Sequence, residues 1–229
     1  MKTLGIIGGV GPGSTAEFYL QVSYGCQKRN EVQRPGIIVG SVPAPYDVER
    51  DMILNNINRY TPLLVTEAVR LQNAGADFLA LPCNTLHCDI DIIRNAVSIP
   101  VISIVDSAAA YINEKAYKKI GLLATAATAE RRIYSKIFDK NNIDYVLPEK
   151  NEQTGLNKLI VNLVVDKYLD EDRKFLHKYI DNMINKGVDC IALACTDLQL
   201  MKPEKDRNDI PIFDTMAVLA DAVIDEILS

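Results

Sequence analysis

The chain has 229 residues, of which 48% are hydrophobic, and a formal net charge of −5. This length and composition suffice to bury the core of one large domain or two small ones. The acidic balance and the lack of a basic run argue against a nucleic-acid surface. Neither a signal peptide nor a run of about 18 apolar residues is visible. We therefore expect a cytoplasmic protein without a membrane span, whose five cysteines stay reduced.

Short apolar runs alternate with helical stretches along the chain, a pattern typical of parallel sheets flanked by helices. Four strands are expected in each half, near residues 2–8, 36–42, 77–82, 100–104, 118–124, 143–147, 188–194 and 211–213. Glycines after helical stretches, at Gly75 and Gly187, are expected to end the helices that lead into two of these strands.

The two halves of the chain repeat one another. Residues 75–83 and 187–195 share a glycine, an aspartate, an apolar run and a final cysteine at matching positions. The repeat predicts an α/β fold of two similar pseudo-symmetric lobes, each a mostly parallel four-stranded sheet flanked by helices, with the active site in the cleft between them. We expect one lobe over 1–105, joined by the C-terminal helix 214–229, and a second over 106–213.

A glycine-rich loop follows the first strand, Gly8-Gly9-Val10-Gly11-Pro12-Gly13-Ser14-Thr15, and opens a helix. Glycines let backbone N–H groups approach an anion, and a helix N-terminus adds partial positive charge. The spacing departs from the dinucleotide pattern, so a small carboxylate is favoured over a dinucleotide, with a structural turn as the alternative. Gly11 and Pro12 are therefore candidate substrate-binding residues.

Each repeated strand ends in a cysteine, Cys83 after Pro82 and Cys195 after Ala194. Residues that can cap a helix follow both cysteines, namely Asn84, Thr85 and Thr196. A helix N-terminus beside a thiol is expected to lower its pKa below the usual value of about 8.5. For one such cysteine alone, a small buried hydrophobe is the simpler interpretation.

Two cysteines at equivalent points of a repeated fold favour chemistry. If the lobes face each other, the thiols approach a ligand from opposite sides. This arrangement suits racemisation of an amino acid, in which one thiolate removes the α-proton and the opposite thiol returns a proton to the other face. Backbone N–H groups and the side chains after the cysteines could stabilise the charge that develops, as could Thr125 and Thr128 at the start of another helix.

The segments Pro82-Cys83-Asn84-Thr85-Leu86-His87 and Ala194-Cys195-Thr196-Asp197-Leu198, with the glycine loop, resemble the cofactor-independent aspartate/glutamate racemase superfamily. Asp197, where the glutamate branch has histidine, favours the aspartate branch. The resemblance implies racemisation of L- and D-aspartate by two thiols without PLP, in a homodimer. It also implies that two cations, Arg50 after the second strand and Lys167 in the second half, hold the carboxylate of the substrate side chain.

Other functions stay open at this point. They are a broader aspartate/glutamate racemase, a one-base relative such as a hydantoin racemase or maleate isomerase, and a non-catalytic two-lobed sensor of acidic amino acids. No lysine has a recognisable PLP context, so no cofactor is predicted. Cys83, His87 and Cys88 could approach one metal ion but lack a fourth ligand, so no metal is predicted either.

Overall fold

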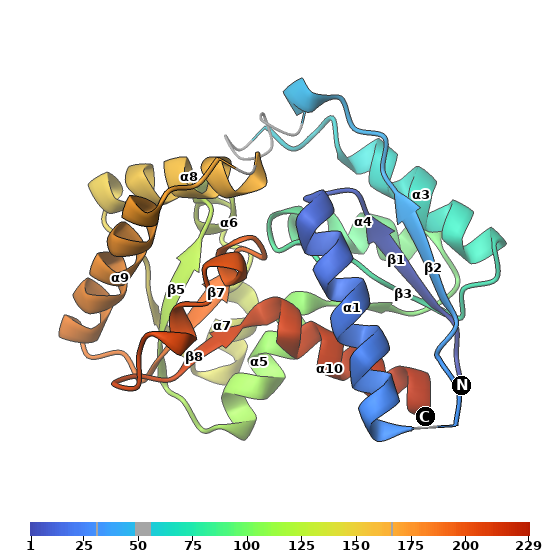
Figure 1. Cartoon of the computed structure of the whole chain (residues 1–229). Helices are drawn as coiled ribbons and strands as arrows, with labels where there is room; N and C mark the ends of the chain where they lie inside the picture. The colour runs from blue at the N-terminus through green and yellow to red at the C-terminus, as the bar shows by residue number, and fades with distance from the viewer. Residues whose placement is uncertain (31, 49–55, 166) are drawn as a thin grey trace.

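Two sheets of four parallel strands organise this computed structural model, which describes residues 1–30, 32–48, 56–165 and 167–229. Figure 1 shows them as two lobes side by side, each with helices packed around its sheet. The predicted α/β fold with two similar lobes is confirmed.

The same strand order occurs in both sheets. The first sheet has the order β2-β1-β3-β4 and the second the order β6-β5-β7-β8, with every pairing parallel. The strands are β1 (Leu4–Gly8), β2 (Ile37–Ser41), β3 (Phe78–Ala80), β4 (Val101–Ile102), β5 (Lys119–Ala124), β6 (Asp144–Val146), β7 (Cys190–Ala194) and β8 (Ile212–Asp214). The central strands β1, β3 and β7 are buried along their whole length, because helices cover both faces of a parallel sheet.

Helices connect successive strands. They are α1 (Pro12–Arg29), α3 (Thr61–Asn73), α4 (Ile90–Ala96), α5 (Ile104–Glu114), α6 (Ala126–Glu130), α7 (Ser135–Asn141), α8 (Lys150–Val164), α9 (Asp170–Asn185) and α10 (Thr215–Leu228), with short 3₁₀ turns η1 (Thr85–Asp89), η2 (Leu198–Met201) and η3 (Pro203–Lys205). Gly75 and Gly187 follow α3 and α9 with φ values of 95° and 72°. A residue with a side chain is strained at such angles, so glycine ends both helices, as the sequence predicts.

The last helix of each half packs against the other half. Helix α5 follows the first sheet but contacts α7, whereas α10 follows the second sheet but contacts α1. The N–H of Lys2 donates to the carbonyl of Ile227 at 3.1 Å, so the two termini lie together, as Figure 1 shows. The lobe boundaries at 1–105, 106–213 and 214–229 stay a prediction.

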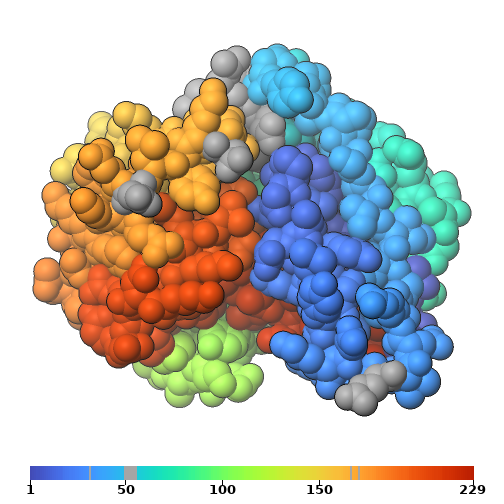
Figure 2. All heavy atoms as spheres, in the orientation of Figure 1, coloured from blue at the N-terminus to red at the C-terminus, as the bar shows by residue number. Residues whose placement is uncertain are grey.

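One apolar core extends across both lobes. It joins side chains of the first sheet, such as Ile6, to side chains of the second, such as Leu122, through Met216 on α10. In Figure 2 the two halves meet along a continuous seam. Among the described helices, none is both long and apolar enough to cross a bilayer. This shared core holds the carboxyl ends of the central strands of both sheets next to the seam.

Candidate active site

A small cavity lies between the lobes, at the carboxyl ends of the central strands. It is lined by Val10, Gly11, Cys83, Asn84, Thr85, Thr125, Ile160, Val164, Cys195, Thr196 and Asp197. Open α/β sheets place ligands at this end of their strands. The cavity volume is about 20 Å³, room for roughly one water molecule. The cavity is thus smaller than the amino-acid substrate that the sequence predicts.

Cys83 reaches this cavity from the end of β3, and its side chain is only 7% exposed. Burial raises the pKa of the Cys83 thiol to about 12, and the N–H groups of Leu86 and Thr85 counter this effect only in part. The negative charge of Asp197 raises it further. The expectation that a helix start lowers this pKa is therefore wrong, because desolvation outweighs the backbone dipoles.

Cys195 has matching surroundings at the end of β7 and is 6% exposed. Burial raises the pKa of Cys195 well above its ordinary value, Asp197 adds to this, and the N–H groups of Asp197 and Leu198 oppose it. The expected lowering is wrong here for the same reason. Cys83 also raises the pKa of Cys195, so the thiols interact electrostatically and forming one thiolate disfavours forming the other.

Asp197 is a buried carboxylate beside the second thiol, and it is not among the site residues that the sequence predicts. Its Oδ2 lies 3.9 Å from Sγ of Cys195, close enough to accept the thiol proton. Its Oδ1 accepts a 2.6 Å hydrogen bond from Oγ of Ser14, which is fully buried at the start of α1. This bond joins the glycine loop of the first lobe to the cysteine motif of the second. The only local signal was the place of Asp197 two residues after Cys195.

Asn84 is held in one orientation by two residues from the second half of the chain. The hydroxyl of Tyr134 donates to Oδ1 of Asn84, and Nδ2 of Asn84 donates to Oγ1 of Thr215 at 3.1 Å. Thr215 in turn donates to the carbonyl of Leu193 at 2.9 Å. Because Thr215 gives its proton to Leu193, its oxygen accepts from Asn84, and the amino end of the amide must face it.

Three buried threonine hydroxyls form a triangle where the lobes meet. Oγ1 of Thr85 lies 2.9 Å from that of Thr125 and 3.1 Å from that of Thr128, and the latter two are 3.0 Å apart. Thr85 and Thr125 line the cavity, whereas Thr128 lies outside its lining. Thr125 also caps α6 by accepting from the N–H of Thr128. The triangle therefore connects the first cysteine motif to the start of a helix in the second lobe.

The glycine loop forms part of the cavity wall. Gly9 and Gly11 have φ values of 79° and 76°, and Gly11 lines the cavity with Val10. Thr15 fixes the loop, because its Oγ1 accepts from the N–H of Gly9 at 3.1 Å and donates to the carbonyl of Gly11 at 3.0 Å. Pro12 starts α1, is exposed, and is not part of the lining.

The two cations expected to hold a substrate carboxylate are not in the described wall. Arg50 lies outside the described residues. Lys167 is exposed just after α8, where its N–H donates to the carbonyl of Asn162 at 2.8 Å, and it does not line the cavity. The part of the wall that α8 supplies is apolar, Ile160 and Val164. Among the described lining residues there is no cation.

His87 has a structural role beside Cys83. Its Nδ1 lies 2.7 Å from the carbonyl of Cys83, and its Nε2 accepts from the N–H of Ile104 at 3.1 Å. This pattern fits the neutral ring with the proton on Nδ1, and burial lowers the pKa of His87 to about 4. Since both nitrogens are engaged, the ring is not placed as a metal ligand. Nor do three potential metal-binding side chains gather elsewhere in the described chain.

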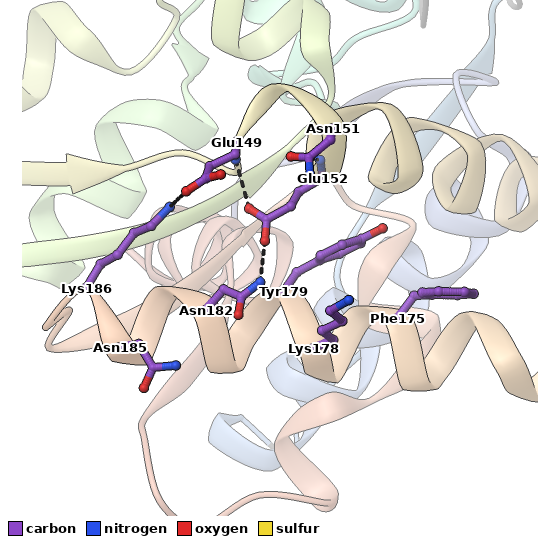
Figure 3. A pocket seen from close by; sticks show the side chains of 9 residues that line it. All are labelled: Glu149, Asn151, Glu152, Phe175, Lys178, Tyr179, Asn182, Asn185 and Lys186. Atoms are coloured by element: carbon purple, nitrogen blue, oxygen red, sulfur yellow. Dashed lines mark hydrogen bonds and ion pairs between the residues drawn. The ribbon is translucent and has the colours of Figure 1, made fainter.

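A wider groove of about 500 Å³ between α8 and α9 lies apart from the cysteines (Figure 3). Its polar groups pair with one another: Glu152 accepts from the N–H of Glu149 at 2.8 Å and from Nδ2 of Asn182, and Glu149 forms an ion pair with Lys186 at 3.1 Å. Glu149 and Glu152 form a capping box at the start of α8. The groove is therefore explained by helix capping and packing.

Comparisons with known proteins agree with this geometry. A family model described as Asp/Glu/Hydantoin racemase matches residues 7–223. The broad specificity amino-acid racemase RacX of Bacillus subtilis (strain 168) is 31% identical over 230 residues, which cover 99% of this chain and 98% of that protein. A candidate Asp/Glu racemase from Yersinia pestis has a crystal structure with a TM-score of 0.87 and 28% identity, covering 100% of both chains. An aspartate racemase homologue from Pyrococcus horikoshii OT3 shares the fold, with a TM-score of 0.81, 24% identity and coverage of 100% of both chains.

Proposed function

The chain belongs to the Asp/Glu/hydantoin racemase family, and from this premise we propose that it racemises an α-amino acid with Cys83 and Cys195 as its two bases. Racemase activity follows from the family, whereas the two-thiol mechanism without PLP is our proposal. The observation that carries it is the pair of cysteines at equivalent strand ends, both lining one cavity.

The protonation states set the order of events in the proposed mechanism. One cysteine must be a thiolate that takes the α-proton, while the other stays a thiol and donates its proton to the opposite face. Burial raises the pKa of both thiols, so the neutral forms dominate at pH 7. The α-ammonium of a bound amino acid brings a positive charge to the site and opposes this effect. Asp197 is placed to accept the proton of Cys195.

Polar groups around the cavity fit a substrate carboxylate. Deprotonation at Cα places negative charge on the carboxylate, which fixed hydrogen-bond donors can stabilise. In our proposal Asn84, Thr85 and Thr196 supply such donors together with Gly11, and Thr125 and Thr128 support them through the hydroxyl triangle. The amide of Asn84 is already oriented by Tyr134 and Thr215, so little reorganisation is needed.

Aspartate is the substrate that the resemblance implies, and we propose it as the first to test. Arg50 and Lys167 would bind its side-chain carboxylate, which requires Lys167 to turn towards the cleft. Homodimeric assembly and a cytoplasmic location are further parts of this proposal.

A broader amino-acid racemase is the second candidate. The described wall contains apolar Val10, Ile160 and Val164 and a carboxylate, Asp197, with no described cation. This wall favours neutral side chains, and the relative from Bacillus subtilis is named for broad specificity.

The mechanism is tested by hydrogen exchange at Cα. Purified protein without added PLP is incubated in D₂O with each enantiomer of aspartate, glutamate, alanine and lysine. Cys83→Ala and Cys195→Ala should each lower racemisation by about 10²-fold or more, the range for removal of an acid or base. Cys26→Ala is the matched control, because Cys26 is buried on α1 away from the cavity.

Full racemisation by either cavity variant would disprove the two-thiol mechanism. Absence of deuterium at Cα with every amino acid would instead favour the non-catalytic sensor. The substrate panel separates the two candidates, because only the aspartate racemase discriminates strongly against alanine and lysine.

A further inference from the structure

A second cavity, of about 330 Å³, lies where the two halves of the chain meet and shares no lining residue with the cysteine site. Its lining comes from η1, α4, the start of α5, and the segment from the end of α6 through α7. The lining residues are His87, Cys88, Ile90, Asp91, Arg94, Ser103, Val105, Asp106, Arg131, Arg132, Ile133, Lys136, Ile137 and Lys140. The volume is within the range of sites that bind small molecules.

Positive charge dominates this lining, which has five cations and two carboxylates. Arg94 faces both carboxylates: its Nη1 is 3.8 Å from Asp91 and its Nη2 is 3.2 Å from Asp106. Nη2 of Arg94 also donates to the carbonyl of Val101 at 3.1 Å. The two acidic groups are thus engaged by one arginine, and the remaining cations give the cavity its net charge.

Three of those cations, Arg132, Lys136 and Lys140, have no acidic partner within 4.0 Å among the residues that the structure describes. Lys136 and Lys140 are four residues apart on α7 and therefore lie on one face of the helix. Like charges at this spacing repel each other. Arg132, which precedes them, has a φ of 52°, an unfavourable value for a residue with a side chain. A bound anion would relieve the repulsion between Lys136 and Lys140.

Apolar side chains complete the wall, with Ile90 and Val105 from the first half and Ile133 and Ile137 from the second. Lysine ammonium and arginine guanidinium groups are the usual protein ligands of phosphate. We propose that this cavity binds a multiply charged phosphate anion, either free or carried by a small organic molecule. An organic carrier would place its apolar part against the isoleucines and valine.

The proposed anion site is connected to the cysteine cavity in both halves. His87 lines it and is bonded through Nδ1 to the carbonyl of Cys83. Ile133 also lines it, and its neighbour Tyr134 donates to Asn84. The lining of the proposed anion site therefore includes residues of both halves that are bonded to, or adjacent in sequence to residues bonded to, the lining of the cysteine cavity.

The test measures binding by calorimetry with two probes, inorganic pyrophosphate and ADP, in the absence of any amino acid. Because no substrate is present, the outcome does not depend on racemase activity. We expect saturable binding of one probe molecule per chain. Equal affinity for the two probes would identify free phosphate as the recognised group, whereas tighter binding of ADP would indicate an organic phosphate.

The double variant Lys136→Gln, Lys140→Gln should weaken binding by about tenfold or more, since two charge contacts are lost. The matched control is Lys174→Gln, Lys178→Gln, an exposed pair at the same spacing on α9 that changes the net charge equally. The control should bind within about twofold of the unmodified chain, because neither Lys174 nor Lys178 lines the cavity. Equal weakening in both double variants, or no saturable binding of either probe at millimolar concentration, would overturn the proposal.

Discussion

The hydrogen bond from Ser14 to Asp197 is one of the direct links between the two lobes at the cysteine cavity, and Ser14→Ala removes its donor. Ser14 is fully buried and Asp197 is 8% exposed, so water replaces the lost bond poorly. A hydrogen bond to a charged group contributes about 1.5–3 kcal/mol. Asp197 keeps its contact with the Cys195 thiol, so we expect the free energy of unfolding to fall by an amount near the lower end of this range, about 1.5–2 kcal/mol.

Urea unfolding followed by circular dichroism measures this loss, since the chain has no tryptophan to report by fluorescence. With a slope of roughly 2.5 kcal/mol per molar urea, the midpoint should fall by roughly 0.7 M.

Ser23→Ala is the matched control, because Ser23 is buried on the same helix and the change has the same effect on helix propensity. Its midpoint should stay within about 0.3 M of the unmodified chain. If Ser14→Ala and Ser23→Ala lowered the midpoint equally, the inter-lobe bond would contribute nothing and the reasoning would fail.

Three further outcomes are expected. Asp197→Asn keeps an acceptor for the bond with Ser14 but removes the negative charge that raises the pKa of Cys195. The limb of the pH profile of kcat/KM that reports thiolate formation should therefore move to lower pH. A limb that does not move would contradict this. Burial in the folded chain lowers the pKa of His87 from 6.5 to about 4. The neutral ring therefore contributes about 3 kcal/mol to the free energy of unfolding above pH 6.5, and this contribution is lost as the pH falls towards 4. Urea midpoints at pH 7 and pH 4.5 should therefore differ less in His87→Gln than in the unmodified chain, and equal differences would refute the assignment. Thr125→Val removes the cap of α6 and the hydroxyl contact with Thr85. It should lower the free energy of unfolding by about 1–2 kcal/mol in the same assay. An unchanged urea midpoint would show that the hydroxyl triangle does not stabilise the fold.

The architecture was predictable because its signals are local. Apolar runs located all eight strands, and Gly75 and Gly187 located two helix ends, since both patterns depend on nearest neighbours in the sequence. Strand β4 is shorter than predicted, Val101–Ile102 in place of 100–104, because Ser103 already caps α5 by accepting from Val105 and Asp106.

The site was only partly predictable. The repeat identified Cys83 and Cys195, but Ser14 and Asp197 are 183 residues apart, and no local pattern connects them. The thiol pKa was predicted in the wrong direction because helix starts are visible in a sequence and the depth of burial is not. The contributions of Arg50 and Lys167 stay predictions.

The crossed placement of α5 and α10 has a consequence for how such a chain could arise. Each of these helices follows one sheet and packs against the opposite half, as in a domain-swapped dimer whose two copies have been fused end to end. A single half would leave its final helix without the helix of the other half that it packs against here. Pairing of two such half-length chains would restore both contacts, α5 with α7 and α10 with α1.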